Sequence, residues 1–317
     1  MYNILVTGVG AIIGYGIIDS LKQSSKDVNV IGMDIFEDAA GRFMADKFYQ
    51  AILAKDPGYP DYVNNLIEKE KIDLVFLGTE HEIYALCDNK EKLGDNYSKI
   101  VINTDQNIAF SKDKWETYSF LQNHGIKTIK TVLDGEYDEL CELLGSPFLL
   151  KPKNSTASKG IHTIENREEF DFYKKQAGDQ RMFQQIVGDK EHEYTVSVFG
   201  YGDGTSTKPF ALRRKLSGEG ATVKAWIYHD PLLDLEVEKL VKILKPYGPT
   251  NLQFRLHEGE YYMLEINPRV SSACSIRTAF GYNEPEMCIE YYLEHKTLNP
   301  TFREEGTAIR YIKDMII

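Results

Sequence analysis

The chain has 317 residues, of which 42% are hydrophobic and 27% are charged, and its formal net charge is −11. This length predicts two or three packed units rather than one core. The acidic balance disfavours nucleic acid as a partner, and no apolar run reaches the roughly 20 residues of a membrane span. The N-terminal MYNILVTG enters a strand without the basic and apolar regions of a signal peptide, so we expect a cytoplasmic protein.

The first third of the chain alternates strands with helices. An apolar helix over 12–21 follows the first strand, and further helical stretches separate the others. Strands that alternate with helices are typical of a parallel, doubly wound sheet, which we expect over residues 1–104. The predicted strands are 3–7, 28–34, 72–77 and 99–103.

The rest of the chain has a different pattern. A helix is predicted over 112–126, ending at Gly125. From about residue 147 the chain is rich in strands joined by turns such as 202–204 and 258–259. This pattern predicts an α+β unit with antiparallel sheets. Helices at about 166–178, 232–246 and 283–294 interrupt the strands.

A glycine-rich turn, Gly8 to Gly14, follows the first strand, and Asp34 closes the second. Glycines at this place let a phosphate approach a helix N-terminus, and an acid about 20 residues later can hold a ribose. The third glycine, however, stands one place late for a dinucleotide fingerprint. We therefore favour a packing turn that lines a substrate crevice, with a nicotinamide site as the alternative.

Two stretches of the strand-rich region could hold a nucleotide. Lys151 ends the apolar strand 147–152, and the small-residue loop 154–160 follows it. A lysine and a loop of this kind can neutralise and cover phosphates, although a surface hairpin explains them equally well. The stretch 182–188, followed by Glu193, could present backbone groups to an adenine edge and an acid to a ribose. Plain strand alternation is the alternative there.

The most informative stretch is the strand pair 251–255 and 262–269 across the turn at 258–259. Alternate residues of a strand share a face, so Glu265, Asn267 and Arg269 point together and Gln253 can face them. Polar groups that converge on an apolar sheet are costly unless something binds there. Mg²⁺ with nucleotide phosphates supplies the reason, and a salt-bridged polar face is the alternative.

These features, in this order, resemble the ATP-grasp superfamily. The run NLQFRLHEGEYYMLEINPRVSSACSIRTAFGY is similar to the synthetase domains of the carbamoyl phosphate synthetase large chain. The resemblance spans roughly residues 100–295 and extends more loosely to GVGAIIGYGIIDSLK, which looks like the pre-ATP-grasp domain of stand-alone members. It implies a Rossmann-like pre-ATP-grasp domain over 1–104 and a two-part ATP-grasp domain over 105–317. The second domain would divide into a small lid subdomain at about 115–187 and a C-terminal subdomain at about 188–317.

The resemblance also implies roles for individual residues, with ATP and two Mg²⁺ ions (or Mn²⁺ in their place) as cofactors. Arg269 would stabilise the transferred phosphoryl group, and Lys151 would grip the nucleotide. Glu193 would bind the ribose. The other implied positions are Lys114 for ATP phosphate, Ser155, Ser158, Lys159 and Gly160 in the phosphate lid, Gln184, Gln185, Ile186 and Val187 in the adenine hinge, and Gln253, Glu265 and Asn267 as metal ligands.

The chain departs from the family pattern at three places. The hinge opens with Gln184 rather than Glu, and two extra residues before Glu193 make Glu191 a competitor for the ribose. The lid has one glycine instead of several. The first metal position is Gln253, as in the carbamoyl phosphate synthetase group, which lowers the negative charge without removing a ligand.

Substrate contacts are harder to assign. Strand alternation allows only one of Arg213 and Arg214 to face the site. We assign Arg213 a catalytic role beside Lys151 and Arg269, and give Arg214 a substrate contact. Further candidates are Arg277 and Ser271 for a substrate carboxylate, and Glu82, with Asp34 and Glu80, either for an amine or as solvated carboxylates.

The predicted function is that of an ADP-forming carboxylate–amine ligase, which makes an amide through an acyl phosphate. Its partners would be a small-molecule carboxylate and an amine, and a homodimer is the default assembly. The alternatives are a non-catalytic ATP-grasp ligand-binding protein, a nicotinamide-dependent oxidoreductase that uses the N-terminal turn, and carboxyphosphate chemistry on bicarbonate.

Overall fold

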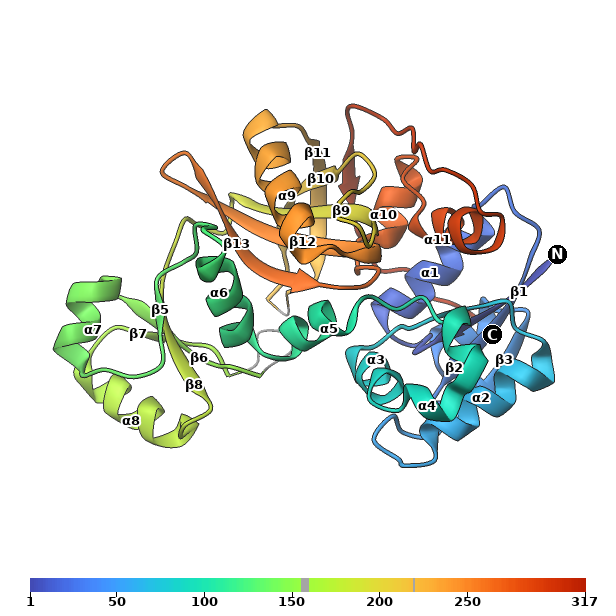
Figure 1. Cartoon of the computed structure of the whole chain (residues 1–317), viewed down its shortest axis with the longest axis horizontal. Helices are drawn as coiled ribbons and strands as arrows, with labels where there is room; N and C mark the ends of the chain where they lie inside the picture. The colour runs from blue at the N-terminus through green and yellow to red at the C-terminus, as the bar shows by residue number, and fades with distance from the viewer. Residues whose placement is uncertain (155–159, 219) are drawn as a thin grey trace.

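The computed structural model describes residues 1–154, 160–218 and 220–317. Three sheets organise this part of the chain: two have four strands and one has six. Figure 1 shows the N-terminal sheet at one end, a small sheet at the other, and the six-stranded sheet above and between them. We call the corresponding parts the N-terminal unit, the small unit and the C-terminal unit. No helix in the described residues is long and apolar enough to span a membrane.

The N-terminal sheet is parallel and has the order β3-β2-β1-β4. Helix α1 covers one face, while α2 and α3 cover the other, so side chains from both faces of β1 are buried. This confirms the doubly wound sheet. The strands are β1 (Tyr2–Thr7), β2 (Val28–Asp34), β3 (Lys47–Gln50) and β4 (Leu74–Phe76), and the helices are α1 (Ile12–Lys22), η1 (Ala40–Phe43), α2 (Tyr59–Glu70), α3 (Glu80–Cys87), α4 (Lys90–Leu93) and η2 (Gly94–Lys99).

Two strand predictions in this unit differ from the structure. The expected strand at 99–103 is only a bridge between Ile100 and Val75, because the next residues turn toward the C-terminal unit, where the Asn103 amide donates to Thr250 Oγ1 at 2.8 Å. Edge strand β3 was not predicted. Its two end residues are exposed, so it lacks the apolar run of a buried strand.

The predicted helix at 112–126 is the second of two consecutive helices, α5 (Asp105–Lys112) and α6 (Lys114–Asn123). The break lies at Asp113, which has extended backbone angles and whose carboxylate accepts from the N–H groups of Trp115 and Glu116. A side-chain cap of this kind begins a new helix. The buried Leu121 of α6 packs in the core of the C-terminal unit, so the core of the small unit lies after α6.

The small unit is an antiparallel sheet of order β5-β8-β6-β7 with two helices on one face. Phe148, Leu150 and Phe183 point to these helices, whereas Lys151 and Gln184 alternate to the other face. The elements are β5 (Thr131–Val132), α7 (Tyr137–Leu144), β6 (Phe148–Pro152), β7 (His162–Ile164), α8 (Arg167–Ala177) and β8 (Arg181–Gln185).

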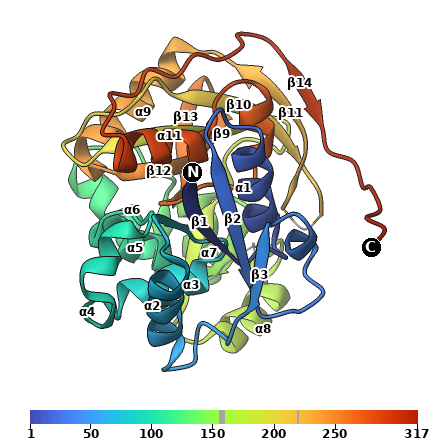
Figure 2. The ribbon, with the colours of Figure 1, turned by 90° about the vertical axis from the view of Figure 1, so that its right-hand side faces the viewer.

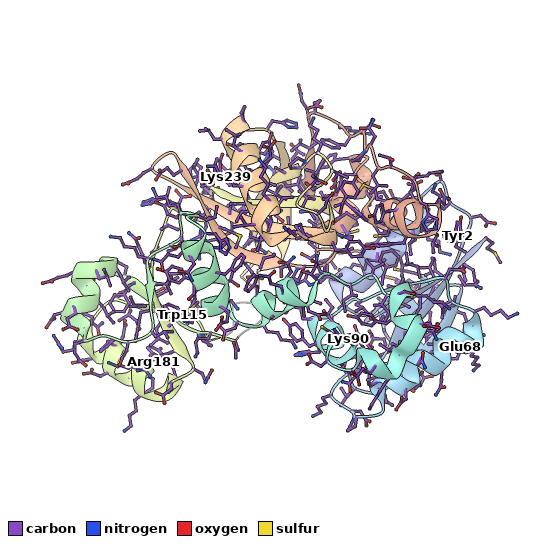
Figure 3. All side chains as sticks on the ribbon, in the orientation of Figure 1. Tyr2, Glu68, Lys90, Trp115, Arg181 and Lys239 are labelled. Atoms are coloured by element: carbon purple, nitrogen blue, oxygen red, sulfur yellow. The ribbon has the colours of Figure 1, made fainter. Side chains whose placement is uncertain are left out.

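The C-terminal sheet has the order β13-β12-β9-β10-β11-β14 and is antiparallel. Helix α9 covers one face, and α1, α10 and α11 lie against the other. The labelled side chains of Figure 3 help to locate the units: Trp115 marks α6, Arg181 the small unit and Lys239 helix α9. The elements are β9 (Glu193–Tyr201), β10 (Phe210–Leu216), β11 (Thr222–Tyr228), α9 (Pro231–Leu244), β12 (Tyr247–His257), β13 (Glu260–Asn267), α10 (Cys274–Ala279), α11 (Glu284–Cys288), the π-helical turn η3 (Ile289–Leu293) and β14 (Thr307–Ile309).

The N-terminal and C-terminal units share one hydrophobic core. Ile17 of α1 belongs to the same buried cluster as Phe210 of β10 and Ile276 of α10. Polar contacts cross the boundary too, since Ser20 Oγ accepts from Thr278 Oγ1 at 2.9 Å. Figure 2 shows α1 lying beneath the C-terminal unit. These two units therefore form one packed body, whereas the small unit has a core of its own.

Candidate nucleotide and metal site

An open cleft lies where α5, α6, the small unit and β13 meet. Figure 1 shows α5 and α6 running along this junction below the C-terminal sheet. Both lysines predicted to contact phosphates line the cleft, and so does one predicted metal ligand. The polar side chains that line it include Lys114, Lys151, Gln184 and Glu265.

Lys151 is buried on the cleft side of β6. Its ammonium donates to Gln184 Oε1 at 2.6 Å, and the Gln184 amide donates to Thr131 Oγ1 at 2.8 Å. Burial, together with the nearby Lys114, lowers the Lys151 pKa to about 8, although Glu265 acts in the opposite direction. A buried cation beside another cation favours an anionic ligand in this cleft.

The predicted metal ligands lie on neighbouring strands of one sheet face. Gln253 is directly opposite Glu265, and Asn251 is opposite Asn267. A register shift after Gln253 pairs Phe254 with Met263, which leaves Glu265 on the same face as Gln253. The sequence prediction that these residues converge agrees with this register.

The donor chemistry of this face fits Mg²⁺. Within the described residues, no hydrogen bond or ion pair engages the Glu265 carboxylate. No group of three or more His, Cys, Asp and Glu side chains able to hold a metal occurs in the described ranges. The face instead offers the Glu265 carboxylate with the side-chain amides of Gln253 and Asn267. Hard oxygen donors of this kind are those that Mg²⁺ prefers.

Arg214, not Arg213, faces this site. The Arg214 side chain is buried and donates to Gln253 Oε1 at 2.7 Å and to Glu193 Oε1 at 2.8 Å. Arg213 points to the opposite face, where its guanidinium carbon lies 4.6 Å from the centroid of the Trp226 ring. The prediction of a catalytic role for Arg213 is therefore wrong, because strand alternation turns it away from the cleft.

Glu193, the predicted ribose ligand, is held between two arginines. Its second oxygen accepts from Arg255 at 2.8 Å, and the residue is only 4% exposed. A ribose hydroxyl would have to share these oxygens with both guanidinium groups. The competing residue, Glu191, is exposed. Sequence reasoning missed Arg255, although its position two residues after Gln253 places it on the same strand face.

The hinge residues follow β8 into a short connection. Gln185 N–H donates to Lys130 O, and Ile186 is partly buried. The buried Val187 offers its carbonyl to Arg255 at 3.4 Å. Their role in reading adenine stays a prediction.

The predicted phosphate lid is only partly described. Gly160 has a positive φ of 73°, and a Cβ there would lie 2.9 Å from Pro152. The predicted lid residues Ser155, Ser158 and Lys159 lie outside the described residues. At the other side of the cleft, the backbone N–H of Lys114 donates to Lys153 O at 3.0 Å, which ties the start of α6 to the end of β6.

Arg269 connects the metal strand to the N-terminal unit. Its guanidinium donates to Glu80 Oε1 at 2.7 Å and to Asn267 Oδ1 at 3.1 Å. Glu80 was predicted either to contact an amine or to be a solvated carboxylate. The second prediction is wrong, because Glu80 is paired with Arg269. The position of Glu80 after a strand end was the signal in the sequence, but its partner lies 189 residues away.

Arg277 and Ser271 belong to an internal network. Arg277 has no exposed surface and donates to Ser271 Oγ at 2.6 Å and to Asn251 Oδ1 at 2.8 Å. It also pairs with Glu284 at 3.4 Å. The prediction that Arg277 binds a substrate carboxylate is wrong, because no substrate can reach it. Ser271 is likewise buried and committed to Arg277.

Glu82 is also structural. Its carboxylate accepts from Thr7 Oγ1 at 2.7 Å, from Tyr59 OH at 3.0 Å and from the Thr79 backbone at 3.0 Å. Burial raises the pKa of Glu82 despite these hydrogen bonds. Both predicted readings, an amine ligand and a solvated carboxylate, are therefore wrong, because the side chain caps α3 and joins it to β1.

The glycine-rich turn is a packing turn. A Cβ on Gly14 would lie 2.2 Å from Gly8 O, so only glycine lets α1 pack this closely on the turn. Asp34 accepts from the N–H groups of Gly10 at 2.7 Å and Phe36 at 2.9 Å. The acid that would hold a nicotinamide ribose is thus committed to the backbone.

Two family models match parts of this chain. Residues 190–315 match the family model described as "ATP-grasp in the biosynthetic pathway with Ter operon", and residues 4–101 match "PylC-like, N-terminal domain". The C-terminal part of the chain thus matches an ATP-grasp family model, and the chain has the ATP-grasp fold.

Curated relatives of this chain include carbamoyl phosphate synthase large chains. That of Thermotoga sp. (strain RQ2) is 26% identical over 216 residues, covering 59% of this chain and 20% of the relative. The large chain of Thermoplasma acidophilum is 23% identical over 291 residues, which cover 81% of this chain and 27% of the relative. The chain thus spans only about a fifth to a quarter of the length of these relatives.

Solved structures share the ATP-grasp fold over nearly the whole chain. N5-carboxyaminoimidazole synthetase from Staphylococcus aureus, complexed with ADP, has a TM-score of 0.78 at 18% identity, covering 98% of this chain and 82% of that one. Biotin carboxylase from Campylobacter jejuni has a TM-score of 0.74 at 17% identity, covering 96% and 74%. At such identities the likeness concerns the fold.

Proposed function

We propose that this protein is an ATP-dependent carboxylate–amine ligase that forms an amide through an acyl phosphate and releases ADP and phosphate. One observation carries the proposal. The buried Lys151 and the uncommitted Glu265 carboxylate line the same cleft, and Gln253 lies beside Glu265. A site for MgATP needs a cation that binds the phosphates and, opposite it, oxygen atoms that bind Mg²⁺.

In this proposal Gln253, Glu265 and Asn267 hold two Mg²⁺ ions, or Mn²⁺ in their place. The metal supplies neutralisation of the phosphate charge that develops during transfer. Lys151 and Lys114 bind nucleotide phosphates, and the hinge 184–187 binds adenine. Glu193 binds the ribose. Because Arg214 and Arg255 both contact the Glu193 carboxylate, the ribose hydroxyls share its oxygens with these arginines.

The reaction has two steps. A carboxylate oxygen of the substrate attacks the γ-phosphorus, and the bond from the γ-phosphorus to the β-phosphate oxygen breaks, giving ADP and an acyl phosphate. An amine nitrogen then attacks the acyl carbon, phosphate leaves, and the nitrogen loses a proton. Arg269, next to Asn267, stabilises the transferred phosphoryl group.

Release of ADP from purified protein with MgATP tests the proposal. Pools of amino acids, hydroxy acids, amines and bicarbonate are added in turn, and Glu265→Gln serves as the variant without the central carboxylate. We expect one pool to stimulate release in the wild type and not in Glu265→Gln. Stimulation by bicarbonate without an organic acid would instead favour carboxyphosphate chemistry.

Other outcomes contradict the ligase. Stabilisation by MgATP without ADP release from any pool would indicate a non-catalytic binding protein. If MgATP neither binds nor turns over while NADH binds, the N-terminal turn has to be reconsidered, even though Asp34 is already bonded to the backbone.

A further inference from the structure

Arg214 already places a positive charge against a proposed metal ligand. Its Nη2 donates to Gln253 Oε1 at 2.7 Å, the oxygen that would bind Mg²⁺ in the proposed function. The same nitrogen donates to Glu193 Oε1 at 2.8 Å. An arginine keeps its proton throughout the physiological range, so this charge can leave the oxygen only if the side chain moves.

We propose that Arg214 is a built-in counter-cation of the metal site: it competes with a divalent ion for Gln253 Oε1, and the ion binds there only when the Arg214–Gln253 hydrogen bond breaks. This inference rests on the proposed function, since it assigns Gln253 to the metal. Arg214 thereby acts as a positioning residue that keeps metal out until nucleotide arrives.

Electrostatics supports the exclusion. Gln253 Oε1 can accept from Arg214 or bind a divalent ion. If it did both at once, the two cations would lie within a few ångströms of each other. At such a distance, repulsion between a guanidinium and a divalent ion opposes simultaneous occupancy. Negative phosphates relieve this repulsion, because they give both cations an anionic partner.

The surroundings of Arg214 favour such a rearrangement. Its Nε is buried and lacks a hydrogen-bond partner among the described residues, so an added anionic acceptor would improve its bonding. Glu193 would keep a partner when Arg214 moves, because Arg255 holds its other oxygen at 2.8 Å. The rearrangement therefore leaves no unpaired buried carboxylate.

The proposal predicts metal affinity in the absence of nucleotide. Mn²⁺ binding is measured by electron paramagnetic resonance for the wild type, Arg214→Met and Arg214→Lys. We expect Arg214→Met to bind Mn²⁺ about tenfold more tightly or better, a modest gain for removing one nearby unit charge. Arg214→Lys keeps the charge and should bind as weakly as the wild type.

The neighbouring arginine provides a matched control. Arg213→Met removes the same charge and side chain from the opposite face of β10, where Arg213 lies over Trp226. We expect no gain in Mn²⁺ affinity. In the Arg214→Met background, Glu265→Gln should abolish the gain, which assigns the bound ion to this site. Thermal unfolding of each variant confirms that it is folded.

The inference and the proposed function fail in different ways. If Arg214→Met binds Mn²⁺ no more tightly than the wild type, or if Arg213→Met gives an equal gain, the inference is overturned, while wild-type turnover of MgATP would leave the proposed function standing. If the wild type neither binds nor hydrolyses MgATP, the proposed function fails first.

Discussion

Glu80, in the first turn of α3, accepts a hydrogen bond from Arg269 Nη2 at 2.7 Å across 189 residues of sequence. The two side chains are only 20% and 15% exposed, so solvent screens this ion pair less than one on the open surface. The pair joins the N-terminal unit to the strand that bears the proposed metal ligands.

A double-mutant cycle measures this link. Glu80→Gln, Arg269→Gln and the double variant are unfolded in urea at pH 7. Because the pair is partly buried, we expect a coupling free energy of about 0.5–1.5 kcal/mol, above the median for surface pairs. The exposed pair Lys112–Asp88 should give less under the same conditions. Equal coupling in both pairs would contradict a special role for Arg269–Glu80.

Binding of MgATP should weaken as the pH rises above 8. Burial and Lys114 lower the Lys151 pKa to about 8, so the protonated form that attracts phosphate is progressively lost above that value. Bound phosphate favours the ammonium, and ATP binding above pH 8 should therefore take up a proton. We expect affinity to fall by at most about tenfold per pH unit in calorimetry between pH 8 and 9.5. Lys151→Arg stays charged, and its affinity should not follow this decline.

Gly14 and Gly16 lie on the same helix, α1, and should respond in opposite directions to substitution by alanine. A Cβ at Gly14 would lie 2.2 Å from Gly8 O, a backbone atom that cannot move cheaply. We expect Gly14→Ala to cost about 1–3 kcal/mol. At Gly16 the nearest atom is Ser275 Oγ at 3.9 Å, so alanine should stabilise the protein by up to about 1 kcal/mol. Denaturant unfolding of the two variants measures both changes in stability. A Gly14→Ala variant as stable as the wild type would refute the packing role of the turn.

Arg277→Met should be strongly destabilising. It removes the cationic partner of Glu284, which is 1% exposed and would keep only Ser197 as a hydrogen-bond donor among the described residues. An uncompensated buried carboxylate costs about 3–5 kcal/mol. Adding Glu284→Gln removes the stranded charge and should recover part of the loss in urea unfolding. If the double variant is no more stable than Arg277→Met, the ion pair is not the cause.

Much of the fold follows from local signals. Alternating apolar strands and helices predict the doubly wound sheet, and the turn at 258–259 predicts the hairpin of β12 and β13. The same alternation places Glu265 opposite Gln253. Strands β3, β5, β11 and β14 were not predicted. Of these, β3 and β14 are short edge strands with exposed ends, which leave no apolar run.

The position of a side chain in the site can be predicted only where its partner is close in sequence, or where the alternation of residues along a strand fixes the face on which it lies. Alternation shows that Arg213 and Arg214 face opposite ways, but not which way, because the two faces of β10 are both covered. Arg277 and Glu82 were misassigned for a related reason. Their partners, Asn251 and Thr7, come from distant strands, and burial turns an apparently reactive side chain into a structural one.

The division of the hydrophobic cores has a consequence for motion. Because α1 is packed into the C-terminal unit, separating the first sheet from the rest would expose Ile17 and its neighbours to water. The small unit has its own core of Phe148, Phe170 and Phe183, and its chain enters through 127–130 and leaves through 186–192. We therefore expect the cleft to open and close by a swing of the small unit against the other two units, which move as one body. Amide hydrogen exchange should find these two bodies as separate cooperative units.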